Sequence, residues 1–241
     1  MKINNTGYVA RTYNKKFINF VFSLSMFAIL MMMSIIITVG QITPDYSPVS
    51  DTISRMGAKI APYSDILNTG YIIYGIIIIV IAYNLYTRLD HTKIIKLSVI
   101  LLLLHAFGSI FLAVFPDKPD IPGGYWTANI IHNTFSGMFY VSLLLGIIVY
   151  SLKALNNKTM RGIAIFGFTL VTINTIMPFI NVVSYLTEIS GLLQRFLLFL
   201  SYFWVVLTSS ILYRRALLDC SEGFNSIRNT ASLTSILDRD A

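Results

Sequence analysis

Six long apolar stretches set the main constraint on how this chain of 241 residues can fold. They cover residues 17–40, 67–86, 94–115, 131–152, 163–183 and 191–213. An α-helix rises about 1.5 Å per residue, so about 20 residues cross a hydrocarbon core of about 30 Å. Lipid cannot bond backbone N–H and C=O groups, so only helices and closed barrels span a membrane. These stretches are too long for barrel strands. They predict an all-α polytopic membrane protein, a six-transmembrane-helix bundle.

The composition excludes the main soluble classes. The chain is 55% hydrophobic and only 12% charged, whereas soluble domains carry about 25% charged residues. Too little charge remains to build a water-facing surface, which excludes an ordinary soluble enzyme. The net charge of +7 comes from basic residues between the apolar stretches. We therefore expect no nucleic-acid partner, and membrane lipids as the surroundings.

The basic residues also predict the orientation. Fourteen lysines and arginines lie in the N-terminal segment, the second and fourth connections and the tail, against three in the other connections. Lysine and arginine favour cytoplasmic loops, so we expect a multi-pass protein of the cell membrane with both termini cytoplasmic. The predicted division is a cytoplasmic segment 1–16, a membrane domain 17–213 and a flexible cytoplasmic tail 214–241. The other side is called the outer side here.

Polar side chains within the spans gather toward the outer side. Ionisable groups are costly in lipid and usually face the bundle interior or a cavity. The fourth span begins with polar residues spaced for one helix face, namely Asn129, His132, Asn133 and Ser136. This stripe predicts a polar lining in the outer half. Solvation of His132 by lipid headgroups is the alternative.

Three further spans contribute single polar residues. His105 lies in the middle of the third span, where a histidine either binds a neighbouring helix or serves as a ligand or proton relay. Arg195 lies about one turn inside the sixth span. It either extends its side chain to the interface or pairs with an outer carboxylate or an anion. Pro178 follows Asn174 by four residues and cannot donate to its carbonyl, which predicts a kink there.

Two of the candidate site residues in the outer connections are acidic. Asp51 and Arg55 are spaced i, i+4 in the first connection, which predicts one surface ion pair worth about 0.3–0.5 kcal/mol. This pair contributes little to stability, but it can form part of a lid over the polar cavity. Asp117 follows the third span and adds a carboxylate at the same depth.

The predicted function is binding of a small or lipid-derived ligand in a polar cavity in the outer half of the bundle, with no cofactor and no resident metal. The predicted ligand-binding residues are His132, Asn133, Arg195, His105, Asp117, Asn174, Asp51 and Arg55.

Other functions stay open at this point. A metal-dependent intramembrane hydrolase of lipid amides or esters would use His105, His132 and Asp117, because catalytic zinc takes three protein ligands and a water. A haem carrier would use the two histidines as axial ligands. Ion transport has less support, because acids are absent from the span centres in the sequence.

Several short motifs resemble a known family. They are the ISRMGA segment within residues 50–58, Asn68-Thr-Gly70, Phe115-Pro-Asp117, Ile131-His132-Asn133, and Gly191-Leu-Leu-Gln194-Arg195 with Trp204. In this order, over about residues 15–215, they resemble the bacterial and archaeal membrane family named domain of unknown function 998. The resemblance implies a six-helix bundle and no particular substrate. It also implies an acid before the last-span arginine, where this chain has Gln194, so Arg195 lacks that adjacent counter-charge.

Overall fold

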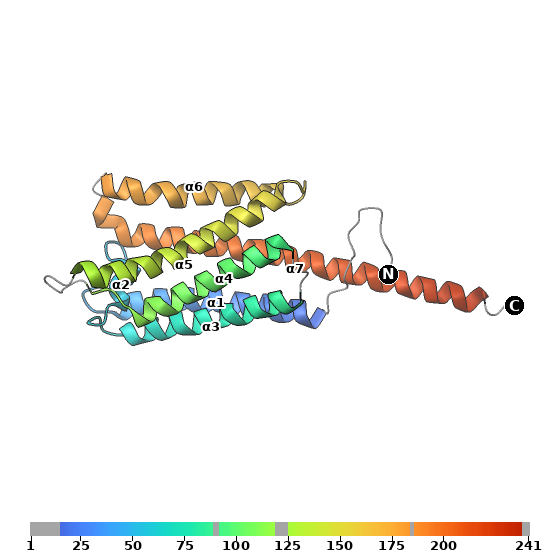
Figure 1. Cartoon of the computed structure of the whole chain (residues 1–241), viewed down its shortest axis with the longest axis horizontal. Helices are drawn as coiled ribbons and strands as arrows, with labels where there is room; N and C mark the ends of the chain where they lie inside the picture. The colour runs from blue at the N-terminus through green and yellow to red at the C-terminus, as the bar shows by residue number, and fades with distance from the viewer. Residues whose placement is uncertain (1–14, 89–91, 119–124, 184–185, 238–241) are drawn as a thin grey trace. The chain divides into compact units, whose positions relative to one another are not determined.

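The computed structural model describes residues 15–88, 92–118, 125–183 and 186–237, and every regular element in them is helical (Figure 1). The predicted N-terminal segment lies outside these residues as far as residue 14. In chain order the elements are α1 (Lys15–Ile42), α2 (Ile53–Gly57), α3 (Ser64–Arg88), α4 (Lys93–Val114), α5 (Tyr125–Ala154), α6 (Arg161–Val183), the 3₁₀ helix η1 (Leu186–Ile189) and α7 (Ser190–Leu237).

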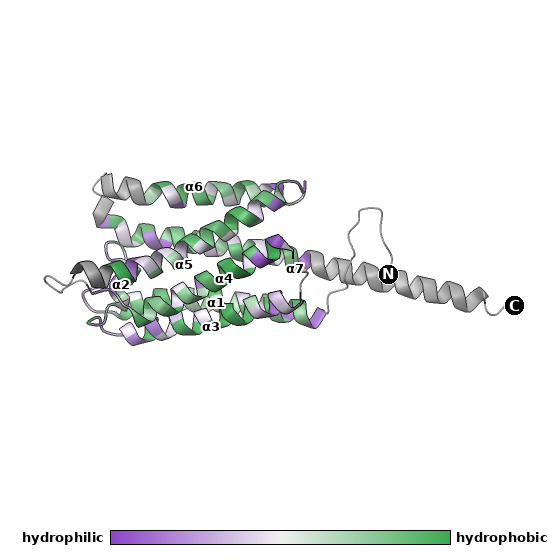
Figure 2. Cartoon of the chain, in the orientation of Figure 1, coloured by the Kyte–Doolittle hydropathy of each residue, from purple (hydrophilic) through white to green (hydrophobic). Residues whose placement is uncertain are grey.

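Five of the described helices are long and apolar enough to cross a membrane: α1, α3, α4, α5 and α7. Where Figure 2 colours these helices by hydropathy, green, the hydrophobic colour, predominates. The fifth predicted span coincides with α6, whose described apolar part, Arg161–Met177, is shorter than the other five. The all-helical membrane architecture is therefore confirmed, whereas a span at α6, and with it the count of six, stays a prediction. Helix α7 continues beyond the sixth predicted span to Leu237.

The described residues form two compact units. The smaller joins residues 15–23 to residues 206–237. Within it the ring of Phe22 stacks on Tyr213 with 4.3 Å between centroids, and the Tyr213 hydroxyl donates to Asn19 Oδ1 at 3.0 Å. The larger unit, Leu24–Val205, contains all the predicted site residues.

Helices adjacent in the chain pack side by side in the larger unit: α3 with α4, α4 with α5, and α5 with α6. Small residues allow the closest approaches. A Cβ built at Gly108 of α4 would lie 2.6 Å from the backbone nitrogen of Phe139 in α5. Close backbone contact through small residues is typical of helix packing in lipid, where the hydrophobic effect gives no preference for another helix over acyl chains.

An apolar core and an apolar exterior occur together in the larger unit. Trp204 packs with Leu144, Ile147 and Leu170, and its indole N–H donates to the Ile163 carbonyl at 3.2 Å. Leu30 is meanwhile 60% exposed on the helix surface, and many other large apolar side chains are exposed. A soluble protein rarely exposes so much contiguous apolar surface, so this exterior fits contact with lipid.

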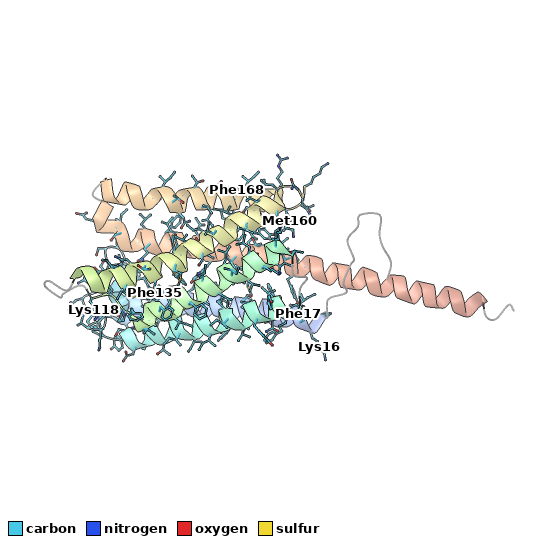
Figure 3. All side chains as sticks on the ribbon, in the orientation of Figure 1. Lys16, Phe17, Lys118, Phe135, Met160 and Phe168 are labelled. Atoms are coloured by element: carbon cyan, nitrogen blue, oxygen red, sulfur yellow. The ribbon has the colours of Figure 1, made fainter. Side chains whose placement is uncertain are left out.

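One end of the larger unit carries α2 and is called the α2 end below. It contains the connection from α1 to α3, the residues after α4, and η1 (Figure 1). Lys118 and Phe135 lie toward this end, whereas Met160 lies at the opposite end (Figure 3).

Candidate functional site

Arg195 is buried at the α2 end, at 8% exposure. Its Nη1 donates to the carbonyl oxygens of Pro48, Asp51 and Gly191, each at 2.9 Å. Its Nη2 donates to the Tyr46 hydroxyl. The guanidinium is therefore bonded to carbonyl oxygens and a phenol, in place of the carboxylate or anion considered from the sequence.

Other residues at the start of α7 bind the same connection. Gln194 Oε1 accepts the backbone N–H of Ile53 at 2.7 Å, which satisfies one of the unpaired donors at the start of α2. The Ser190 hydroxyl donates to the Ser50 carbonyl at 2.7 Å, and Leu192 N–H donates to the Val49 carbonyl at 2.8 Å. A Cβ at Gly191 would overlap the backbone of Asp51. The first turns of α7 thus hold the first connection and α2 in place.

Tyr46 completes this attachment. Its hydroxyl lies 2.9 Å from the carbonyl oxygens of both Asp51 and Thr52, and it accepts from Arg195. Burial raises the pKa of Tyr46 above its ordinary value, while the hydrogen bond and positive charge of Arg195 act in the opposite direction. The neutral phenol is therefore the form that the folded connection favours.

Asp51 and Arg55 form the ion pair predicted from their spacing. The Arg55 side chain is 60% exposed, so the pair is solvated. The Asp51 carboxylate also accepts the Ser47 N–H at 2.8 Å, which stabilises the turn before α2.

His105 joins three helices in the interior. Its Nδ1 lies 2.6 Å from the Phe139 carbonyl oxygen in α5 and therefore donates to it. Its Nε2 lies 2.9 Å from the Tyr74 hydroxyl of α3 and accepts from it. Both ring nitrogens are bonded to protein atoms, which is the interhelical contact considered as one alternative from the sequence.

Asn174 and Asn133 are in different surroundings. The Asn174 amide donates to the Leu170 carbonyl at 2.9 Å, and its Oδ1 accepts from the Tyr140 hydroxyl, which links α6 to α5. Asn133 is exposed on α5. The side chains of Asn129 and Pro178, also named from the sequence, lie outside the described residues.

A pocket of about 380 Å³ lies at the α2 end. Its lining comes from α2, α3, the end of α4, α5 and the start of α7. Polar lining residues include Asn68, Tyr71, Asp117, His132, Ser136 and Gln194. Apolar ones include Leu112, Phe139, Val141, Leu193, Leu197 and Leu198. The volume and the mixture of many apolar with few polar groups are typical of small-molecule sites.

His132 is the buried titratable residue of this pocket, at 6% exposure. Its Nδ1 lies 3.0 Å from the Phe115 carbonyl oxygen, which orients the ring. Its Nε2 is buried and has no hydrogen-bond partner among the described residues. Asp117, two residues after Phe115, also lines the pocket and accepts the N–H of Lys118 at 2.9 Å.

The structure thus brings His132 and Asp117 together at the pocket, while Arg195, His105 and Asn174 bind protein atoms around it. The sequence did not single out Tyr46 or Gly191 as functional, although Gly191 and Gln194 flank Arg195 in a quoted motif. The first turn of α7 meets residues about 140 positions earlier, and Tyr46 meets Arg195 149 positions later, and the sequence alone carries no signal for either contact.

The geometry gives no support to a metal or haem centre. Among the side chains that the structure describes, no three of His, Cys, Asp or Glu group closely enough to hold a metal ion. His105 has both nitrogens bonded to Phe139 and Tyr74, so neither is available as a zinc or iron ligand in this arrangement.

Comparison with known proteins identifies a family. A family model described as protein of unknown function (DUF998) matches residues 26–211. No curated protein and no solved structure matches the chain. The matched range includes the described membrane helices through most of their length and every residue of the pocket. The chain therefore belongs to the DUF998 family of uncharacterised membrane proteins.

Proposed function

We propose that this protein is a six-span protein of the cell membrane with both termini cytoplasmic, and that its pocket at the α2 end binds a small or lipid-derived ligand. The distribution of lysine and arginine supports the orientation. It assigns the α2 end, with its connection 43–63, to the outer side.

One observation carries the binding proposal. His132 Nε2 is buried against the pocket without a protein partner among the described residues. A buried polar atom left unbonded costs about 1–3 kcal/mol, so such atoms are usually satisfied by water or a ligand. The contact with Phe115 holds the ring in the pocket wall.

The surroundings favour an amphiphilic ligand. Leucines and aromatic rings form much of the lining, and Val141, which is 52% exposed on α5, extends the lining to the apolar exterior. A ligand could thus enter from the membrane with an apolar part against the leucines and a polar head near His132 and Asp117.

The other predicted site residues would act indirectly. Arg195 holds the first connection, and with it the α2 wall of the pocket. Asp51 and Arg55 stabilise the same connection. His105 and Asn174 fix the helices that carry Phe139 and Tyr140 of the lining.

A pair of glycine substitutions on one helix tests the proposal. Gly137 lines the pocket and Gly146 does not, and a Cβ at either position has no neighbour within 4 Å in the described structure. We expect protein purified in a mild detergent to retain a lipid or small molecule by native mass spectrometry, and Gly137→Leu to lose it. Gly146→Leu should retain it. If the wild-type protein retains nothing beyond what Gly137→Leu retains, in screens of lipid extracts and small ligands, the proposal is wrong.

A further inference from the structure

Building on the proposed function, we infer that the polar head of the ligand is a hydrogen-bond donor, carrying O–H or N–H groups, and that it binds His132 Nε2 and the Asp117 carboxylate. The inference rests on the unused hydrogen-bonding capacity of the pocket.

The contact of His132 with Phe115 fixes which nitrogen carries the proton. A carbonyl oxygen can only accept, so Nδ1 at 3.0 Å from the Phe115 oxygen must donate. In the neutral ring Nε2 then has a lone pair and no hydrogen. The buried Nε2 therefore needs a hydrogen-bond donor, which no described residue supplies.

Asp117 adds a second acceptor to the same part of the pocket. Its backbone follows Phe115, to which the His132 ring is bonded, and both side chains line the pocket. An ionised carboxylate only accepts, and it has about four lone-pair sites. The Lys118 N–H occupies one of them.

Three donors of the lining are bonded to protein atoms. Asn68 Nδ2 donates to the Gly57 carbonyl at 3.1 Å, and the Ser190 hydroxyl donates to the Ser50 carbonyl at 2.7 Å. The Tyr140 hydroxyl donates to Asn174. Hydroxyls such as that of Ser136 both donate and accept, so they favour neither a donor nor an acceptor on the ligand. These three donors are used within the protein, whereas His132 and Asp117 present acceptors, which matches a donor-bearing head better than an ether or ester head.

The test compares three probes that differ only in the head: 1-dodecanol, dodecylamine and dodecyl methyl ether. The full chain is placed in nanodiscs of dioleoyl phosphatidylcholine, whose headgroup has no hydrogen-bond donor. Binding is measured at pH 8 by the shift in thermal unfolding and by the ¹⁵N resonances of labelled histidine. The chain has only three histidines, and His132→Phe assigns the relevant signal. Probe concentrations are expressed as mole fraction in the bilayer, because all three partition into lipid.

We expect the alcohol and the amine to bind at least about tenfold more tightly than the ether, because the ether leaves both acceptors unsatisfied. The His132 Nε2 resonance should move toward its hydrogen-bonded position with the alcohol and not with the ether. Asp117→Asn, which keeps an oxygen for the Lys118 N–H, should reduce the preference severalfold. This substitution is informative because it replaces one acceptor of residue 117 by a donor and leaves His132 unchanged.

Equal binding of alcohol and ether to the wild type, with both lost in Gly137→Leu, would overturn this inference and leave the proposed function intact. A preference for the ether would overturn it as well. If none of the three probes binds and Gly137→Leu behaves like the wild type, both the inference and the proposed function fail. A preference that distinguishes alcohol from amine identifies whether the head is hydroxylic or cationic.

Discussion

Arg195 Nη1 donates to the carbonyl oxygen of Asp51 at 2.9 Å, across 144 residues of sequence. The same guanidinium also binds Pro48, Gly191 and Tyr46. A single cation thus attaches the connection between α1 and α3 to α7.

Replacing Arg195 should therefore destabilise the protein. In Arg195→Lys the charge remains, but one ammonium cannot reproduce the planar set of donors. We expect a loss of about 3 kcal/mol and a fall in Tm of about 6–12 °C, measured by thermal unfolding in detergent. The matched control is Arg55→Lys in the exposed ion pair with Asp51, which should change stability by about 0.5 kcal/mol or less. Equal effects of the two substitutions would contradict the role assigned to Arg195.

Gly191 should not tolerate a side chain. Its Cα faces the backbone of Asp51 so closely that a methyl group would overlap it, and backbone cannot move aside as a flexible side chain can. Gly191→Ala should cost about 1–3 kcal/mol through overpacking. Gly146→Ala, in open space on α5, should be neutral or stabilising by up to about 1 kcal/mol, because alanine favours helix. The two melting curves measured side by side test this, and similar curves would show that the close approach is absent.

Tyr46 should make stability fall in alkaline solution. Its pKa is raised in the folded state, so above about pH 10 the unfolded chain loses this proton more readily than the folded chain does. Stability from this group is complete below the unfolded pKa and is lost as pH rises through the folded pKa. We expect the Tm of the wild type to fall more steeply between pH 9 and 11 than that of Tyr46→Phe. Parallel slopes would mean that Tyr46 does not contribute to this dependence.

His105 should stabilise the interior without taking part in metal binding. His105→Phe keeps a ring to stack on Phe139, as His105 does with 4.2 Å between centroids, but it loses both hydrogen bonds. The expected cost is about 1–2 kcal/mol, since hydrogen bonds between membrane helices contribute modestly. The control is Ser98→Ala. Ser98 lies on the same helix and, in the described structure, its hydroxyl donates only to the Ile94 carbonyl of that helix. Zinc analysis of wild type and variant adds a second readout, and stoichiometric zinc lost in His105→Phe would refute this assignment.

The predicted orientation has a direct test with a single cysteine. Cys220 is the only cysteine of the chain and should be cytoplasmic. In intact cells, a membrane-impermeant maleimide should leave Cys220 unlabelled and should label Lys59→Cys in a Cys220→Ser background, because Lys59 is exposed in the outer connection. Labelling of Cys220 alone would reverse the assignment of sides.

Prediction from sequence succeeded for features that depend only on one class of residue or on a simple spacing along the chain. The long apolar stretches predicted the membrane helices, because spanning lipid requires length and hydropathy and little else. The spacing of Asp51 and Arg55 likewise predicted their ion pair, although Asp51 lies just before α2 and only Arg55 is on the helix. The partners of Arg195 and His105 were left as alternatives, because the sequence does not show which helices are neighbours.

The amino-acid sequence by itself thus determined the membrane class, the helical architecture and the polar positions that need partners in lipid. The tertiary structure decided which partners they have. It assigned Arg195 to the backbone of the first connection and His105 to Phe139 and Tyr74, and it left His132 facing a pocket. The physical reason is that apolar pattern fixes how far a helix extends, whereas hydrogen bonds between distant segments depend on how the helices pack against one another.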